Sequence, residues 1–386
     1  MMKKGNILPL TFILISALAA IVFSYSYLTV TSLKNSGRAV SQAQALCLAE
    51  AGLAKATWYL MTPVVSGGKG ITWRTPGTTE SFAGGSYTLR INDPSSGNIL
   101  ITAEGTVGSV NRVIQAEYNQ YPAAVKYGIF GSNYLGIGDR TRVRGDIYNN
   151  GDVQIDPGAI VSGEVVVTPG HSISGGGTWT PGSLPADPPA FPWLDTTYYD
   201  AEIAAAAAQN LNINKYYYGT VNLAGGKLYD KNNMTIYGTI VGPGVIAAAY
   251  DLTIKFGATI DQRVTLIAGR NLKFENSISL GGDSTMFGRT SISFFDNIAI
   301  ANRVSLLSPN LVSIGNWQTI NGIIYGGQVS IGNHSVVRGN LIGGATGAVS
   351  LGDDSYFSFD PIRRPSTPPP GLDTSFSFRN GSWKEL

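Results

Sequence analysis

The chain has few of the residues from which cross-links and metal sites are built. Cys47 is the only cysteine among 386 residues, so no disulfide can form within one chain. The two histidines, His171 and His334, are far apart in the sequence, which argues against a site built from cysteine and histidine ligands. We therefore expect no cofactor, although a calcium site made only of carboxylates stays open.

Charged residues are also scarce. They make up 13% of the chain, and 27 basic side chains against 25 acidic ones leave a formal charge of +2. Because the sequence has no basic stripe or basic tail, nucleic acid is not expected as a partner. Glycine, with 48 positions, and tyrosine, with 19, are abundant, and this balance is typical of β-rich, turn-rich extracellular proteins.

No charge occurs between Lys4 and Lys34, and the residues between them predict a membrane span. Residues 7–30 are mostly apolar; as a helix they extend about 36 Å, enough for a hydrocarbon core of about 30 Å. The lysines before the span favour a cytoplasmic N-terminus, which places the rest of the chain outside the cytoplasm. One alternative is a secretory signal cleaved after Ala17-Leu18-Ala19, although the apolar run continues well beyond it. Another is a plain anchor that is never cleaved.

The helix is expected to continue beyond the membrane. Between residues 36 and 60, alanine and leucine recur three or four positions apart, with polar residues between them. This is the pattern of an amphipathic helix. Its many small residues allow the close approach of another element.

These first sixty residues resemble the N-terminal part of the type IV pilin superfamily. A short basic leader ending in Gly5, the apolar span, and Ala-Glu-Ala-Gly-Leu at 49–53 are similar to those of PilX-type minor pilins. The resemblance implies that a prepilin peptidase cuts between Gly5 and Asn6, and that the helix packs with those of other pilin-like subunits. Leu10 stands where major pilins carry a glutamate, and Asn6 replaces the usual apolar first residue. The missing acid resembles K-type pseudopilins, which occupy a filament tip.

Residues 63–121 predict a small antiparallel sheet. Residues 86–91 alternate in polarity, and 99–103 and 110–118 also have strand character, separated by turns rich in glycine, aspartate and asparagine. Pilin-like proteins carry a comparable sheet against the helix. We interpret the segment as an adaptor, because no residue in it suggests chemistry.

Beyond residue 122 the sequence repeats with a period of about 20 residues. Along one track, which begins at Leu252/Ile254, the leading residues follow at steps of 20, 20, 20, 17 and 20. Two more tracks share the period: Ile260, Leu280, Ile300 and Ile320, and Ile246, Leu266, Met286 and Leu306. Three short strands per turn, each stacked on its own kind, predict a parallel β-helix over residues 122–360. A β-propeller would need about 40 residues per blade.

One interruption of the solenoid is expected, at residues 180–218. Its prolines cannot donate ladder hydrogen bonds, and five successive alanines within 197–210 predict a short helix. Its aromatic residues are candidate glycan contacts: Trp193, Tyr198, Tyr199, Tyr216, Tyr217 and Tyr218. The alternative interpretation is that these rings pack the helix onto the solenoid wall. The Pro-rich tail, residues 361–386, is expected to lie along the solenoid and cover an end or a side.

Polysaccharide lyases and hydrolases also use parallel β-helices, with carboxylates gathered on adjacent turns. The acidic candidates here do not recur in register with the period, and most occupy predicted turns: Asp251, Asp261, Asp283, Asp296, Asp353 and Asp354. Asp353 and Asp354 come nearest to a catalytic pair. We expect no catalytic residue and no enzymatic activity.

The sequence thus predicts a mainly β protein, anchored in the inner membrane by a single pass, with its body outside the cytoplasm. Its expected parts are a leader (1–5), a transmembrane and pilin-like helix (6–62), the β adaptor (63–121), the solenoid (122–360) and the tail (361–386). We expect a pilin-like protein of a type IV pilus or a related secretion system, whose solenoid serves assembly, surface display or adhesion to a surface glycan or protein. Two alternatives stay open: an envelope scaffold outside any filament, and a β-helix polysaccharide lyase or hydrolase.

Overall fold

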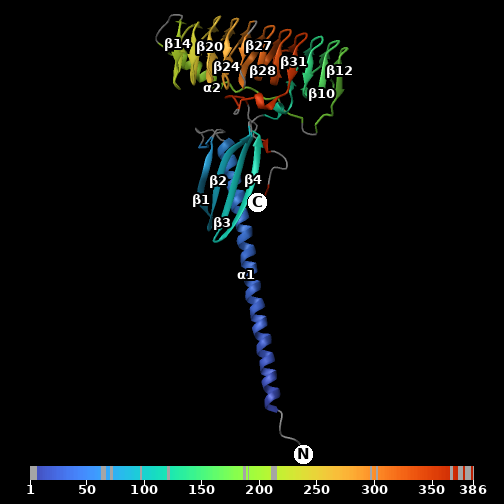
Figure 1. Ribbon diagram of the computed structural model, residues 1–386, viewed down its shortest axis with the longest axis vertical. Coiled ribbons are helices and arrows are strands. Elements are labelled where there is room, and N and C mark those ends of the chain that lie inside the picture. The colour runs from blue at the N-terminus through green and yellow to red at the C-terminus, as the bar shows by residue number, and fades with distance from the viewer. Residues whose placement is uncertain are drawn as a thin grey trace, which may run out of the picture. The chain divides into compact units, whose positions relative to one another are not determined.

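The computed structural model describes residues 7–61, 67–69, 73–95, 98–119, 122–185, 188–189, 191–209, 215–295, 298–300, 303–365, 368–372, 377–378 and 384–385. The chain divides into two units (Figure 1). The first comprises Met1–Asn92, Ile99–Tyr118 and Phe378–Leu386, and the second comprises Asp93–Asn98 and Asn119–Ser377.

The first unit is built on helix α1 (Ile7–Met61), whose two halves differ in their surroundings. From residue 11 to residue 33 nearly every side chain is exposed, although the stretch is apolar. In the second half, one face is buried at three- and four-residue spacings: Ala45, Leu48, Ala49, Ala56 and Leu60. Among the described residues this is the one helix long and apolar enough to cross a membrane, and none of its most apolar window is buried. The predicted amphipathic continuation is therefore confirmed, and the apolar half fits a membrane anchor.

An antiparallel sheet packs against the buried face of α1. Its strands are β1 (Thr75–Phe82), β2 (Gly85–Ser95), β3 (Asn98–Val107) and β4 (Val110–Asn119), with the short β32 (Ser377–Phe378) and β33 (Lys384–Glu385) both paired to β4. Gly105 marks a close approach, since a β-carbon there would lie 2.0 Å from the carbonyl oxygen of Ala45. The predicted small sheet is confirmed; the return of the C-terminal residues to its edge was not foreseen.

The second unit is a parallel β-solenoid of about 11 turns, with about 20 residues and three strands per turn. The first face holds β13 (Lys215–Tyr217), β16 (Met234–Ile236), β19 (Leu252–Ile254), β22 (Asn271–Phe274), β25 (Ser291–Phe294), the ends of β27 (Val304–Ile314) and β28 (Thr319–Ile331), β30 (Val349–Leu351), β6 (Leu135–Ile137), β9 (Val153–Ile155) and β11 (Ile173–Ser174). The second face holds β14 (Thr220–Asn222), β17 (Thr239–Val241), β20 (Thr259–Ile260), β23 (Ser279–Leu280), β26 (Ala299–Ile300), the starts of β28 and β29 (Val336–Gly343), β31 (Tyr356–Ser358), β7 (Arg142–Arg144), the start of β10 (Ile160–Val167) and β12 (Thr178–Pro181). The third face holds β15 (Lys227–Asp230), β18 (Gly244–Ala248), β21 (Val264–Ala268), β24 (Thr285–Gly288), β5 (Ile129–Gly131), β8 (Ile147–Asn149) and the remaining parts of β27, β28, β29 and β10.

The predicted apolar tracks form the core of the solenoid. Ile260 pairs with Leu280, and Leu280 pairs with Ile300, all three buried. The track that begins at Leu252 stacks in the same way, because Leu252 pairs with Leu272 on the next turn. The one short step of the repeat is a shortened turn, where Thr319 pairs with Val336. Period and register are therefore as predicted.

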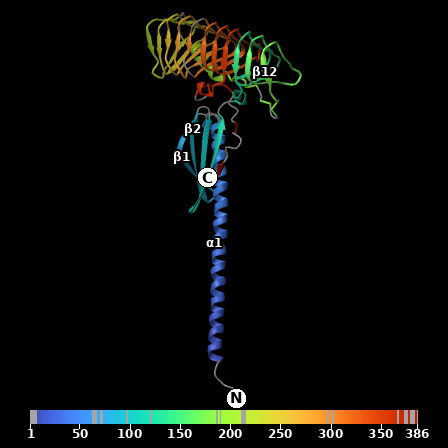
Figure 2. The same ribbon diagram turned by 45° about the vertical axis from the view of Figure 1, so that its right-hand side comes forward.

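The order of the turns in space differs from their order along the chain, which the repeat did not reveal. Strands β5, β6 and β7 stack on β29, β30 and β31, so that Leu135 pairs with Val349 and Val143 with Phe357. The turns of residues 129–181 thus extend the solenoid beyond its last C-terminal turn, and β13 starts the opposite end. Figures 1 and 2 show the early strands up to β12 continuing from β31. The insertion carries the chain from one end of the solenoid to the other.

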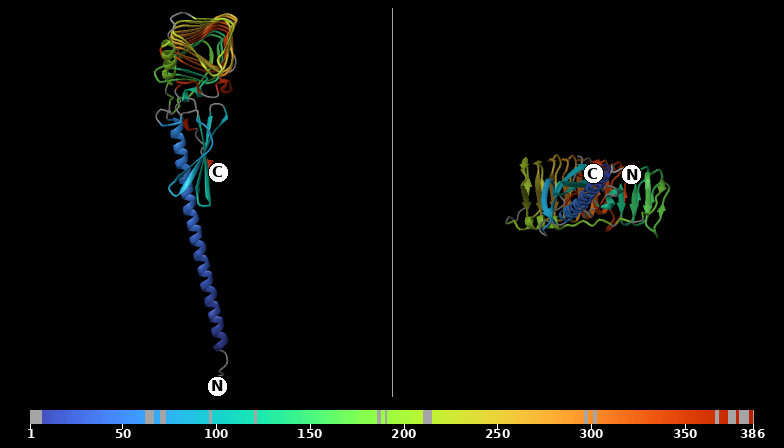
Figure 3. Two further views of the ribbon diagram at one scale, coloured as in Figure 1. Left: turned by 90° about the vertical axis from the view of Figure 1, so that its left-hand side faces the viewer. Right: turned by 90° about the horizontal axis from the view of Figure 1, so that it is seen from below.

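The insertion covers the third face. That face presents an outward apolar ladder, which is buried: Phe130, Tyr148, Val166, Ala247, Ile267, Phe287, Leu307, Tyr325 and Ile342. Helix α2 (Thr197–Ala207) and residues 191–194 lie over it (Figure 3, left). Ion pairs of Glu202 with Lys227 and of Asp200 with Arg289 fasten the helix. Part of the tail joins this layer, since Leu372 is buried and bridges to Leu194.

Candidate functional site: an exposed corner of the solenoid

The corner between the first and second faces is built from a four-residue turn that repeats along the solenoid. Gly332–Ser335, Gly352–Ser355 and Gly138–Thr141 are three examples, each with glycine first and serine or threonine last. The third residue of each turn has a left-handed backbone conformation, with φ of 56° at His334, 54° at Asp354 and 53° at Arg140. Its side chain consequently projects outward, one above the next along the solenoid.

The second residue of the turn explains the frequent asparagine and aspartate. The Asn316 Oδ1 atom accepts the backbone N–H of Asn333 at 2.8 Å, and Asn333 Oδ1 accepts that of Asp353 at 3.0 Å. Asp353 Oδ1 in turn accepts the N–H of Asp139 at 2.9 Å. These side chains complete the hydrogen bonding of the corner, which is the role expected of such residues in turns.

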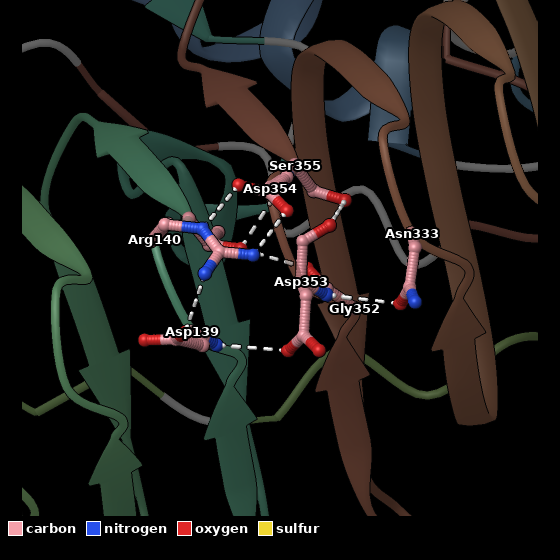
Figure 4. Close-up of polar contacts among 8 residues, drawn as sticks. Asp139, Arg140, Asn333, Gly352, Asp353, Asp354 and Ser355 are labelled. Atoms are coloured by element: carbon pink, nitrogen blue, oxygen red, sulfur yellow. Dashed lines mark hydrogen bonds and ion pairs between the residues drawn. The ribbon is translucent and has the colours of Figure 1, made fainter.

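Asp353 and Asp354 lie at the seam where the two runs of turns meet (Figure 4). The Asp354 carboxylate accepts two hydrogen bonds from Arg140, from Nε and Nη2, both at 2.7 Å. Arg140 also contacts Asp139, with 3.1 Å between Nη1 and Oδ2. The guanidinium holds the pKa of Asp354 below its usual value. A carboxylate of this kind stays ionised and is a poor general acid.

The remaining acidic candidates do not converge. Asp251 accepts the backbone and side-chain N–H groups of Asn271 at 3.2 and 2.9 Å. Asp261 accepts the N–H of the next residue at 2.8 Å, Asp283 lies 3.8 Å from Arg303, and Asp296 lies outside the described residues. In the described part of the chain, no group of three or more His, Cys, Asp or Glu side chains could hold a metal ion.

The structure divides the six aromatic candidates of the insertion between different places. Tyr199 is buried, stacks on Phe287 at 4.0 Å between ring centroids, and donates to the Pro370 carbonyl at 2.8 Å. Burial raises the pKa of its hydroxyl well above the usual value. Tyr198 contacts it edge-on. The Tyr199 ring is therefore not exposed to a glycan, and both rings pack the insertion onto the third face.

The other four candidates lie in two places, Trp193 in the insertion and the three tyrosines at β13. Trp193 is 65% exposed beside Phe191. Tyr216 is exposed in β13, where Tyr217 packs against the core. Tyr218, just beyond β13, stacks on Tyr237 at 4.7 Å.

Sequence reasoning missed an aromatic group on the exposed corner. Trp317 is 61% exposed, has φ of 61°, and stacks on His334 at 4.0 Å. Phe295 and Phe256, 54% and 69% exposed, occupy the same corner on preceding turns. We call these four residues the aromatic corner. Aligning the turns by the 20-residue period would have shown that Trp317 fills a position that earlier turns give to Gly257 and Ser277.

The left-handed conformation of Trp317 has an energetic cost. A left-handed backbone costs a non-glycine residue about 1–2 kcal/mol, and an exposed ring gains little from burial. The same conformation recurs at His334, Asp354 and Arg140, so it belongs to the corner as a whole. What distinguishes this turn is the exposed ring of Trp317, and exposed apolar groups mark interaction surfaces. The aromatic corner is therefore the candidate binding surface of the solenoid.

Comparisons with known proteins give only weak likenesses. No family model and no curated protein matches the chain. The competence-associated pilin ComZ from Thermus thermophilus is similar over 90% of this chain and 97% of that chain, with 14% identity and a TM-score of 0.28. An ice-binding protein from the Antarctic ascomycete Antarctomyces psychrotrophicus is similar over 61% and 95%, with 14% identity and a TM-score of 0.22. Likenesses with such low TM-scores establish no shared fold.

Proposed function

We propose that this chain is a pilin-like, membrane-anchored subunit that presents its β-solenoid outside the cytoplasm. The observation that carries the proposal is the division of α1. Its first half is apolar yet exposed, so it needs either lipid or neighbouring helices around it. Its second half packs on an antiparallel sheet through alanines such as Ala45 and Ala49. A soluble domain has no use for such a helix, whereas a filament subunit uses it first in the membrane and then in the filament core.

We further propose that this subunit assembles into a filament. This proposal is supported by the resemblance of the leader and of residues 49–53 to PilX-type minor pilins. Gly5 and Asn6, the expected processing site, lie outside the described residues. Leu10 in place of the usual glutamate favours a tip position in a type IV pilus or a related secretion system.

Intact mass of the protein extracted from its native membrane tests this proposal. We expect a chain that begins at Asn6. Replacing Gly5 with leucine should block processing, whereas Gly37→Leu, at a helix position with no atom within 4 Å of the added β-carbon, should leave it unchanged. A full-length wild-type chain, or one cut after Ala19, would exclude the filament proposal while leaving membrane anchoring open.

The displayed solenoid is proposed to adhere to a surface glycan through the aromatic corner, without cleaving it. Exposed rings such as Trp317 offer a face on which a sugar ring can stack, and hydroxyls of the second face, including the exposed Thr319, lie beside it. The ionised state of Asp354 supports binding without hydrolysis. Trp317→Gly should abolish retention on a glycan array, and Trp193→Ala, at an equally exposed ring of the insertion, should not. New reducing ends from a polysaccharide panel would instead favour the lyase or hydrolase alternative.

A further inference from the structure

A polar cleft lies in the first unit between α1 and the turn that joins β3 to β4. It has a volume of about 620 Å³, and its lining residues come from one turn of the helix and from the strand beside it: Arg38, Ser41, Gln42, Ser109, Val110, Asn111 and Arg112. Apart from Val110, these residues offer hydroxyl, amide and guanidinium groups. The cleft therefore has hydrogen-bond donors on two walls.

The position of the cleft along α1 places it at the membrane surface. The apolar run ends at Leu33, and Lys34 is the first charge after it. Arg38 follows Leu33 by five residues, about 7.5 Å along the helix. The headgroup layer on each side of a bilayer is about 5–8 Å thick. If the apolar half of α1 spans the hydrocarbon core, as proposed above, the cleft lies among the lipid headgroups.

The sheet reaches this level because of its register on the helix. Gly105 of β3 contacts Ala45, and the turn at Gly108 lies three strand residues further, about 10 Å. Seven helical residues, from Ala45 back to Arg38, cover about the same length. The turn between β3 and β4 and Arg38 consequently lie at the same height along α1. Figure 1 shows this turn directed towards the N-terminal half of α1.

The cleft has an excess of positive charge. Lys34 and Arg38 lie one helical turn apart and so share a face, and among the described residues no carboxylate lies within 4 Å of either cationic group. Two carboxylates are nearby. Glu385 pairs with Arg112 at 3.2 Å, and Glu104 pairs with Arg90 and accepts from Asn111, both at 3.3 Å. After these pairings, Arg38 and Lys34 remain unneutralised.

We propose that this cleft binds the phosphate of an anionic phospholipid in the outer leaflet of the inner membrane. A phosphodiester matches the donors present, since Arg38 can bind two of its oxygens and the hydroxyl of Ser41 and the amide of Gln42 lie on the same wall. The bound lipid would fix the depth of α1 in the bilayer and orient the sheet at its surface. The inference rests on the proposed membrane anchoring.

The test uses the full chain reconstituted in phosphatidylcholine nanodiscs, with and without phosphatidylglycerol, followed by mass spectrometry of the lipids retained in detergent. We expect phosphatidylglycerol to be enriched on the wild type and Arg38→Gln to reduce that enrichment about tenfold, the value of one charge-assisted contact. Arg263→Gln, which removes the same charge from an exposed solenoid position, should keep the enrichment.

The outcomes separate this inference from the anchoring on which it rests. Equal enrichment on the wild type and on Arg38→Gln would overturn the lipid site, and so would release of the lipid by inorganic phosphate at low concentration, which would indicate a site for free phosphate. An acidic group of a neighbouring copy could occupy the cleft in place of the lipid, and a crosslink from position 38 to that copy would detect it. Loss of this crosslink when phosphatidylglycerol is added would support the lipid site. A crosslink that persists in the presence of phosphatidylglycerol would overturn it. Failure of the chain to insert into nanodiscs would instead contradict the anchoring.

Discussion

Replacing Leu280 with aspartate tests the register of the solenoid more sharply than any other single change. The Leu280 side chain is 1% exposed in β23, between Ile260 and Ile300 on the neighbouring turns. Ser279, the residue before it, points outward and is exposed. Leu280→Asp and Ser279→Asp therefore introduce the same group one residue apart, on opposite sides of the solenoid wall.

The expected difference is large compared with the stability of a domain. Loss of a buried leucine side chain costs about 2–5 kcal/mol, and burial of an unpaired carboxylate adds several kcal/mol. A domain has about 5–15 kcal/mol in total, so Leu280→Asp should remove most of the free energy of unfolding. Ser279→Asp should change it by no more than about 0.5 kcal/mol, as at other exposed positions.

The pH dependence adds a second signature. Burial raises the pKa of the new carboxyl above its unfolded value, so the folded state binds more protons between these two pKa values. The stability of Leu280→Asp should then rise as the pH falls through the folded pKa, narrowing its difference from the wild type. Ser279→Asp should show no such change.

Urea titration followed by circular dichroism measures the stabilities, and hydrogen exchange locates the damage. Each turn contacts mainly its neighbours, so protection should fall most in β20, β23 and β26 and least at the two ends of the solenoid. Comparable losses from Leu280→Asp and Ser279→Asp would refute the register. A uniform loss of hydrogen-exchange protection along the whole solenoid would refute the nearest-neighbour argument.

Three further predictions follow from the corner and the sheet edge. Asp354→Asn should lower the urea midpoint at neutral pH, because it removes the ion pair with Arg140. Arg140 holds the pKa of Asp354 below its usual value, so the stabilisation by this pair is present above the unfolded-state pKa of Asp354 and should vanish as the pH falls through its folded-state pKa. Trp317→Gly should keep or raise the melting temperature, since glycine adopts the left-handed conformation without strain; a lower melting temperature would contradict the argued cost. Deletion of residues 377–386 should expose the edge of β4 and increase concentration-dependent light scattering, and an unchanged signal would show that the edge is protected in another way.

The solenoid core could be predicted from the sequence because its signal is local and repeated. Every turn brings an apolar residue to the same place, and the tracks through Ile260 and Leu252 identify strand, face and period together. The helix could be predicted equally well, since a long uncharged apolar run and small residues three or four positions apart are both helical patterns.

The order of the turns could not be predicted, because both runs of turns carry the same kinds of inward residues. The early turns step by 18 residues, as from Leu135 to Val153, and the later run steps by 20 from Leu252 to Leu272, but a step length does not say which turn stacks on which. Nothing local distinguishes a turn that stacks on its sequence neighbour from one that stacks on a turn 214 residues away, as at Arg140 and Asp354. That pair is visible as a complementary contact only once the two turns are adjacent.

The candidate site was missed for a similar reason. The clustered tyrosines of the insertion were the predicted glycan contacts, yet Tyr199 faces the apolar ladder and is buried on Phe287. Trp317 stands alone in the sequence, and its exposure depends on a backbone conformation that the shape of the corner imposes. Composition shows where rings are, whereas only the corner geometry shows which of them point into solvent.

The topology also bears on how the solenoid is held. The chain leaves the first unit after β4 and returns to it in β32, which pairs with the same strand. The solenoid is therefore inserted between two neighbouring strands of one sheet, and both of its connections end on β4. A load on the solenoid is divided between two covalent links, and each link is secured by the ladder that joins those strands. If the solenoid adheres while α1 anchors the chain, as proposed above, this arrangement resists detachment better than a single linker would, because a break in one connection leaves the other attached to the same sheet.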